Sequence, residues 1–115
     1  MSDQEKRILI PCKDGYVVIK KNNICVVEAY EGMARLFLCD GTHICISKSL
    51  SLIKNKLGDN TFFRVNRKYI VNKEYVSKLE KWFNYDFVVK MRNTVNLKIV
   101  LNKKRVPEFV EWIEA

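Results

Sequence analysis

Two Asp-Gly pairs in the first half of the chain each stand between short apolar runs. The flanking runs are Ile8–Ile10 and Tyr16–Lys20 for Asp14-Gly15, and Arg35–Cys39 and His43–Ile46 for Asp40-Gly41. Asp-Gly readily adopts the positive φ angles of tight hairpin turns, so a pair in this setting is a strong hairpin signal. A further run, Ile24–Ala29, is rich in β-branched residues and indicates another strand. The first 46 residues therefore predict a series of short antiparallel strands.

The period of the apolar residues changes after residue 46. Residues 47–57 carry an apolar stripe at i, i+3 and i+7, which is typical of one face of a helix. Its members are Leu50, Ile53 and Leu57. Ser47 or Ser49 can cap the start of this helix, and Gly58 stands where helices commonly end.

The second half of the chain returns to strands and ends in a helix. Tyr85–Met91 and Val95–Leu101 are apolar-rich runs, whereas Lys73–Phe83 fits a helical turn or a strand equally well. Asn102 is a good N-cap for a C-terminal helix over about 103–114. The predicted fold class is mostly β, with small antiparallel sheets of short strands and one or two short helices.

Length and composition indicate a folded globular chain. We expect residues 1–115 to form a single domain, because 115 residues can bury a core without staples. Hydrophobic residues make up 48% and charged residues 30%, which is ordinary for a globular protein. No stretch approaches the roughly 20 apolar residues that cross a bilayer, and the first 11 residues lack the features of a secretory signal. We therefore expect a cytoplasmic location and no membrane partner.

The sequence indicates neither a metal centre nor a catalytic site. Cys12, Cys25, Cys39 and Cys45 form no Cys-x-x-Cys pair, so we expect free buried thiols rather than disulfides. Cys39, His43 and Cys45 gather around the second hairpin, but their spacing matches no common zinc pattern. Neither a Ser/His/Asp order nor a Gly-rich phosphate loop is present. We expect a protein that is not an enzyme and that uses no metal, cofactor or small-molecule substrate.

The net charge of +8 is concentrated in two short segments that contain no acid. Residues 62–73 contribute +4, and residues 98–105 contribute another +4. Of the 21 cations, the 13 outside these segments balance the 13 acids. Concentrated positive charge favours a polyanion such as nucleic acid, while a solvated basic face is the common alternative.

One stretch of the first segment combines core residues with these cations. It reads FFRVNRKYIVN over residues 62–72, and a glutamate ends the apolar part of the earlier strand in Val27-Glu28-Ala29. With the order of strands and turns around it, the sequence resembles the LytTR DNA-binding domain, the output module of many bacterial response regulators. The resemblance covers roughly residues 6–106.

The sequence departs from the usual family pattern at three places. The family commonly reads FFRVHRSYLVN, so Asn66 stands in place of histidine and Lys68 in place of serine. Asn102-Lys103-Lys104 occupies the place where Ser-Arg-Arg is frequent. The base preference of relatives therefore cannot be carried over to this chain.

The resemblance implies that loops, rather than a recognition helix, contact double-stranded DNA. The corresponding segments here are Gly32–Arg35, Asn66–Lys68 and Asn102–Arg105. Arginine suits bidentate bonds to guanine in the major groove, and lysine commonly contacts phosphate. The predicted DNA-binding residues are Arg35, Asn66, Arg67, Lys68, Asn102, Lys103, Lys104 and Arg105.

Two neighbouring polar residues fit a structural role better. The stem of Arg64 is expected to lie along the packed strand, with its head in an ion pair. Asn72 is expected to order the backbone around it.

The partner predicted from the resemblance is promoter DNA with repeated half-sites, on which two copies pair as a homodimer at the nucleoid. A stand-alone regulator and an excised domain both fit the short stretch before the first strand. The alternative function is an RNA-binding or protein-interaction β module that uses the same basic face. Aromatic platforms exposed beside Arg67 would favour that alternative.

Overall fold

A hairpin opens the computed structural model, which describes residues 6–92 and 96–115. Strands β1 (Arg7–Cys12) and β2 (Gly15–Lys20) pair antiparallel, and Gly15 takes the positive φ of 136° that the predicted Asp-Gly turn requires. Side chains alternate between the faces of this ribbon, as the pleat demands. Ile8, Ile10 and Ile19 are buried on one face, and Leu9 and Val18 are exposed on the other.

A five-stranded antiparallel sheet forms the centre of the fold, in the order β5-β4-β3-β7-β6. Its strands are β3 (Ile24–Tyr30), β4 (Met33–Leu38), β5 (His43–Ile46), β6 (Phe62–Arg64) and β7 (Tyr69–Asn72). The middle strand β3 is covered on both faces, which explains why its sequence reads as a nearly continuous apolar run.

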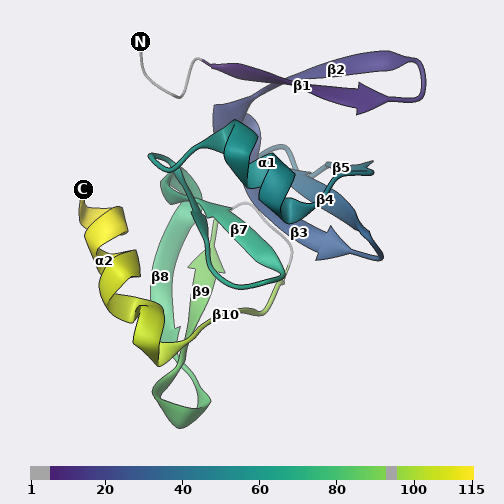
Figure 1. Cartoon of the computed structure of the whole chain (residues 1–115). Helices are drawn as coiled ribbons and strands as arrows, with labels where there is room; N and C mark the ends of the chain where they lie inside the picture. Colours follow the sequence, from purple (N-terminus) through teal and green to yellow (C-terminus); the bar gives the residue numbers. More distant parts are fainter. Residues whose placement is uncertain (1–5, 93–95) are drawn as a thin grey trace.

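Helix α1 (Leu50–Leu57) and the β1–β2 hairpin cover one face of the central sheet (Figure 1). The Ser49 hydroxyl accepts a hydrogen bond from the Leu52 backbone N–H, so Ser49 rather than Ser47 is the N-cap. Gly58 follows the helix with φ 81°, as predicted. The predicted stripe of Leu50, Ile53 and Leu57 is fully buried in this first core.

A second sheet and a second helix cover the opposite face of the central sheet. The sheet has the order β10-β9-β8, with β8 (Val76–Lys81), β9 (Phe87–Met91) and β10 (Ile99–Leu101). Helix α2 (Val106–Glu114) lies beside it in the lower left of Figure 1. Phe63, Val89, Leu101 and Phe109 are among the residues of this second core.

In residues 6–92 and 96–115, four 3₁₀ turns link these elements: Lys21–Asn23, Lys73–Tyr75, Phe83–Tyr85 and Lys103–Arg105. They refine three of the sequence predictions. The undecided stretch 73–83 holds both a helical turn and the strand β8. The predicted strand at 85–91 begins only at Phe87, because Tyr85 belongs to a turn, and the α-helix begins at Val106 rather than 103.

The predicted strand Val95–Leu101 is shorter in the structure. The ladder of β10 runs over Ile99–Leu101 only, and the part of the prediction that falls on residues 93–95 lies outside the described residues. The predicted fold class is nevertheless confirmed: the molecule is mostly β, with small antiparallel sheets and two short α-helices. In the described part of the chain, no helix is long and apolar enough to pass through a bilayer.

All four cysteines are free, but the expectation that they are buried holds only in part. Cys25 is fully buried, and this burial raises the pKa of its thiol to about 12. Cys12 and Cys45 are exposed, because they lie on strands with one face open to solvent. Within residues 6–92 and 96–115, no three potential ligands are grouped as a metal site would require.

Candidate nucleic-acid interface

Arg64 holds the loop between β6 and β7 in place. Its guanidinium donates to the backbone carbonyls of Asn66 (3.2 Å) and Arg67 (3.0 Å), and to the hydroxyl of Ser51 on α1 (3.0 Å). Its polar partners in the described residues are therefore carbonyls and a hydroxyl, instead of the ion pair that the sequence suggested. Arginine can satisfy several acceptors at once because its five donors are rigidly spread. The loop is thus fixed from the strand that precedes it.

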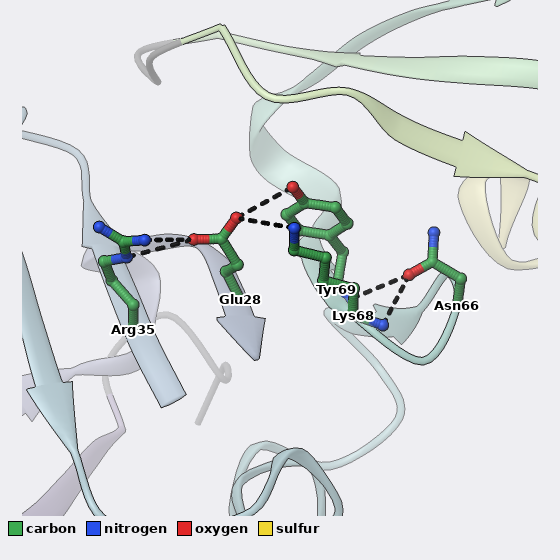
Figure 2. Close-up of polar contacts among 5 residues, drawn as sticks. All are labelled: Glu28, Arg35, Asn66, Lys68 and Tyr69. Atoms are coloured by element: carbon green, nitrogen blue, oxygen red, sulfur yellow. Dashed lines mark hydrogen bonds and ion pairs between the residues drawn. The ribbon is translucent and has the colours of Figure 1, made fainter. Parts of the chain in front are cut away.

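Asn66 orders the same loop from within. Its Oδ1 accepts from the backbone N–H groups of Lys68 (2.8 Å) and Tyr69 (3.0 Å), as Figure 2 shows. Its Nδ2 donates to the carbonyl of Val100 on β10, at 2.8 Å. A side chain that replaces histidine in the usual family pattern therefore links the β6–β7 loop to the strand that leads into the second basic segment.

Residues 102–105 are tied to that loop by Arg105. Its Nη1 donates to the carbonyls of Arg64 (2.6 Å) and Val65 (2.7 Å), and its Nε lies 2.6 Å from Glu108 Oε1. The guanidinium also lies over the ring of Phe63, with 4.8 Å from Cζ to the ring centre. The two acid-free segments of the sequence are thereby brought side by side.

The start of the second segment is shaped by two acceptors. Asn102 Oδ1 accepts from the Lys104 backbone N–H at 2.8 Å, so Asn102 caps the 3₁₀ turn that leads into α2, whereas the sequence had predicted a cap of the α-helix itself. Asp86 Oδ1, from the turn before β9, accepts from the Lys103 backbone N–H at 2.8 Å. Both N–H groups at the start of the 3₁₀ turn are therefore occupied, and the lysine side chains carry the charge outward.

Four exposed cations lie on the β6–β7 loop and on the 3₁₀ turn before α2: Arg67, Lys68, Lys103 and Lys104. Arg67 and Lys104 make no polar side-chain contact with the described residues. Lys68 Nζ lies 3.9 Å from Glu28 Oε2, with the Lys68 side chain 59% exposed. Lys103 and Lys104 precede α2, where the helix dipole disfavours positive charge. The arrangement thus offers positive charge to an anion outside the molecule.

The buried carboxylate of Glu28 lies next to Lys68. Glu28 Oε1 accepts from Arg35 Nε (3.2 Å) and lies 3.1 Å from its Nη2, and Oε2 accepts from the Tyr69 hydroxyl at 3.0 Å (Figure 2). These three residues lie in one row across β4, β3 and β7. Burial, and then the hydrogen bond to Glu28, raise the pKa of Tyr69 to about 12.

Arg35 therefore lies in different surroundings from those the sequence suggested. It was expected in a DNA-contacting loop, but it belongs to β4, and its guanidinium also stacks on the Tyr30 ring at 3.7 Å. The turn between β3 and β4 is made by Glu31-Gly32, and Met33 is half-buried. Arg35 is connected to the β6–β7 loop through Glu28, which contacts both Arg35 and Lys68.

Sequence reasoning missed the role of Glu28 as a support of this site, and with it the hydrogen bond that Glu28 accepts from Tyr69. Arg64, in contrast, was expected to be structural. A lone acid in the apolar strand ICVVEAY was an available signal, because an acid there needs a buried partner. Asn72 agrees with its predicted role: it is fully buried, donates to the Ile24 carbonyl and accepts from the Glu74 backbone N–H.

The fold and the site define the class of protein: a small, mostly-β domain with a basic surface built from loops. The sequence profile of the LytTr DNA-binding domain matches residues 14–114. The chain therefore belongs to the LytTR family, and the predicted resemblance is confirmed.

Relatives and a solved structure agree with this assignment. Sensory transduction protein LytR of Staphylococcus haemolyticus is 29% identical over 91 residues, which are 77% of this chain and 35% of the relative. Sensory transduction protein LytT of Bacillus subtilis is 26% identical over 88 residues, or 75% of this chain and 36% of the relative. The chain thus spans about a third of the length of these curated relatives.

The fold matches a LytTr DNA-binding domain of a response regulator from Bacillus cereus. The TM-score is 0.75 at 15% sequence identity, and the match covers 96% of this chain and 99% of that one. At this identity the likeness concerns the fold alone.

Proposed function

We propose that the chain binds double-stranded DNA in a sequence-specific manner and regulates transcription in a bacterium. The observation that carries this proposal is the docking of the two acid-free segments, through Arg105 on Val65 and Asn66 on Val100. The LytTR assignment supports DNA as the polyanion. Rigidly placed cations on loops suit this task, because phosphate contacts set the register and base contacts select the sequence.

The predicted site residues divide into two groups by their surroundings. Arg67, Lys68, Lys103 and Lys104 point their charge to solvent, and we propose that they contact DNA. Arg67 is the candidate for guanine in the major groove, and the lysines are candidates for phosphates.

The other four predicted residues already have partners inside the molecule. Arg35 is held by Glu28, Asn66 and Asn102 accept from loop N–H groups, and Arg105 holds β6. We propose that these residues act mainly by positioning the four exposed cations.

Selection of bound sequences from a random duplex pool tests the assignment. The wild type, Arg67→Ala, Lys104→Ala and the matched control Lys13→Ala would be compared; Lys13 is exposed in the turn of the β1–β2 hairpin. We expect Arg67→Ala to relax selection at one base position and Lys104→Ala to weaken binding across all sequences. The control should behave as the wild type.

Two results would contradict the proposal. If Arg67→Ala and Lys104→Ala select and bind as the wild type does, the site is wrong. If no duplex motif emerges while single-stranded RNA binds tightly, the alternative of an RNA-binding module is correct.

The arrangement on DNA is a further part of the proposal. We propose that residues 1–115 act as one LytTR domain at the bacterial chromosome, and that two copies pair on repeated half-sites. Titration of one-repeat and two-repeat duplexes measures this pairing. Equal affinity per site on both duplexes would exclude cooperative binding.

A further inference from the structure

The β8–β9 hairpin ends in a group of exposed aromatic side chains that lie outside the four cations of the proposed interface. We call Trp82–Asp86 the aromatic tip. In it, Trp82 is 38%, Phe83 73% and Tyr85 83% exposed. Aromatic side chains carry a large apolar area, and three of them exposed on one short turn indicate a contact surface.

The backbone conformation of the aromatic tip is unfavourable for a tyrosine at position 85. The Asp86 N–H donates to the Phe83 carbonyl at 3.0 Å, which closes a four-residue turn. Its two central residues both have positive φ, 56° at Asn84 and 66° at Tyr85, as in a type I′ turn. Asn is common at the first of these positions, but glycine is strongly preferred at the second, and a bulky residue there is an outlier. A tyrosine at this position therefore suggests a use outside the hairpin.

Lysine side chains flank the aromatic tip. Lys98 Nζ lies 4.3 Å from the centre of the Trp82 ring, and Lys103 Nζ lies 5.7 Å from the Tyr85 ring. A shallow cavity of about 570 Å³ runs along the tip, lined by Lys81, Trp82, Asn84, Tyr85, Asp86 and Phe87. The acid among them, Asp86, is occupied by the Lys103 backbone N–H.

The aromatic tip is continuous with the proposed DNA interface. The Asp86–Lys103 hydrogen bond joins it to the second basic segment, and Figure 1 shows the tip below the start of α2. A ligand that contacts Lys103 and Lys104 therefore passes close to Tyr85. The combination of exposed rings and lysines fits a polyanion with apolar sugar surfaces, which is the chemistry of the DNA backbone.

We propose that the aromatic tip extends the interface onto the deoxyribose-phosphate backbone beside the bases contacted by the loops. Tyr85 and Phe83 pack against deoxyribose, and Lys81 and Lys98 face phosphates. This inference rests on the proposed DNA binding. It adds a contact to the DNA that flanks the recognised bases. Because this contact is made to the backbone, it makes affinity depend on the length of the duplex and not on the identity of the flanking bases.

The test uses Tyr85→Gly and Phe83→Ser, with Tyr16→Ser as the matched control. Tyr16 is 69% exposed on the distant β1–β2 hairpin. Each variant is titrated with two duplexes that carry the site selected by the wild type, one ending at the site and one with about one turn (~10 base pairs) of flanking DNA on each side.

We expect Tyr85→Gly to weaken binding of the long duplex about tenfold and to leave the short duplex unchanged. Its hydroxyl-radical footprint should lose several protected sugars at one edge. Its melting temperature should not fall, because glycine suits the positive φ of this position. Phe83→Ser should behave similarly on DNA, and Tyr16→Ser should match the wild type.

Three results would overturn the inference. Unchanged affinity and footprint with Tyr85→Gly and Phe83→Ser would show that the aromatic tip does not contact DNA. Loss of pairing on a two-repeat duplex, with unchanged binding to one repeat, would assign the tip to a second copy of the chain. If the wild type itself binds no duplex, the proposed function fails as well. This outcome differs from the other two because it is seen before any residue of the aromatic tip is changed.

Discussion

Glu28 illustrates how a single residue supports this site. It lies in an apolar strand, is 5% exposed, and shares its two oxygens between Arg35 and Tyr69. A buried carboxylate is costly unless charged and polar partners surround it. The partners come from the two strands that flank β3, namely β4 and β7, so Glu28 connects the edge of the proposed interface to the centre of the fold.

Glu28→Gln should lower the free energy of unfolding by about 2–3 kcal/mol. The side chain keeps its shape, but the Arg35 guanidinium loses its charged partner while it remains largely covered. Urea unfolding measures the change, with Glu111→Gln on an exposed face of α2 as the control, expected within about 0.5 kcal/mol of wild type. A Glu28→Gln protein as stable as the control would show that the pair contributes little.

Tyr69 predicts a specific dependence of stability on alkaline pH. Its pKa is raised from 10.0 to about 12, chiefly by burial, so the folded state binds the phenolic proton more tightly than the unfolded state. This contribution is complete below pH 10 and is lost as the pH rises towards 12. Tyr69→Phe should therefore show a smaller fall in unfolding free energy between pH 10 and 12. The exposed Tyr16→Phe is the control, and identical pH profiles for both variants would contradict the assignment.

At the scale of elements, two arginines fix loops that have little structure of their own. Strand β6 has three residues and the 3₁₀ turn before α2 also has three, which is too short for independent stability. Arg64 and Arg105 supply the missing bonds by donating to backbone carbonyls across the loop boundaries. Both carry positive charge, but their hydrogen bonds hold the backbone of these loops in place.

Arg105 and Lys104 should therefore respond differently to substitution. Arg105→Ala removes charge-assisted bonds to two carbonyls and should cost about 2 kcal/mol of stability as well as DNA affinity. Lys104→Ala should leave stability unchanged or slightly raised, because it removes a cation near a helix start, while DNA affinity falls.

Arg105→Lys separates charge from geometry at this position. It keeps the charge but not the planar fork, so it should resemble Arg105→Ala in thermal unfolding. Full rescue of both stability and binding by lysine would assign Arg105 to charge alone.

At the scale of the whole molecule, the central sheet separates two cores. The proposed contact segments lie on the side of the second core. Hairpin and α1 residues fill the first core, and the second sheet and α2 fill the other. The second core contains Phe63, Val65 and Leu101, which lie in or next to the proposed contact segments. Packing of this core therefore sets the distance between the two groups of cations.

The proposed interface predicts a steep salt dependence of DNA binding. If Arg67, Lys68, Lys103 and Lys104 each neutralise a phosphate, log K should fall with log [salt] with a slope of about −3.6. Fluorescence titrations over a series of salt concentrations measure this slope, and Lys104→Ala should reduce its size by about 1. A slope near zero would show that the cations do not meet phosphates.

The sequence by itself determined most of the element types, the Asp-Gly turn before β2, the helical stripe of α1 and the position of the charge excess. These features depend on neighbours in the chain, on periodicity and on turn chemistry. Tertiary structure decided which cations are supports and which are free to contact a ligand. Arg64, Arg67 and Arg105 carry the same charge in the sequence. Their roles differ because folding places the carbonyls of residues 64–67 beside Arg64 and Arg105, whereas Arg67 faces solvent. The two carbonyl partners of Arg105 lie 40 and 41 positions away in the sequence, a separation that no local pattern can reveal.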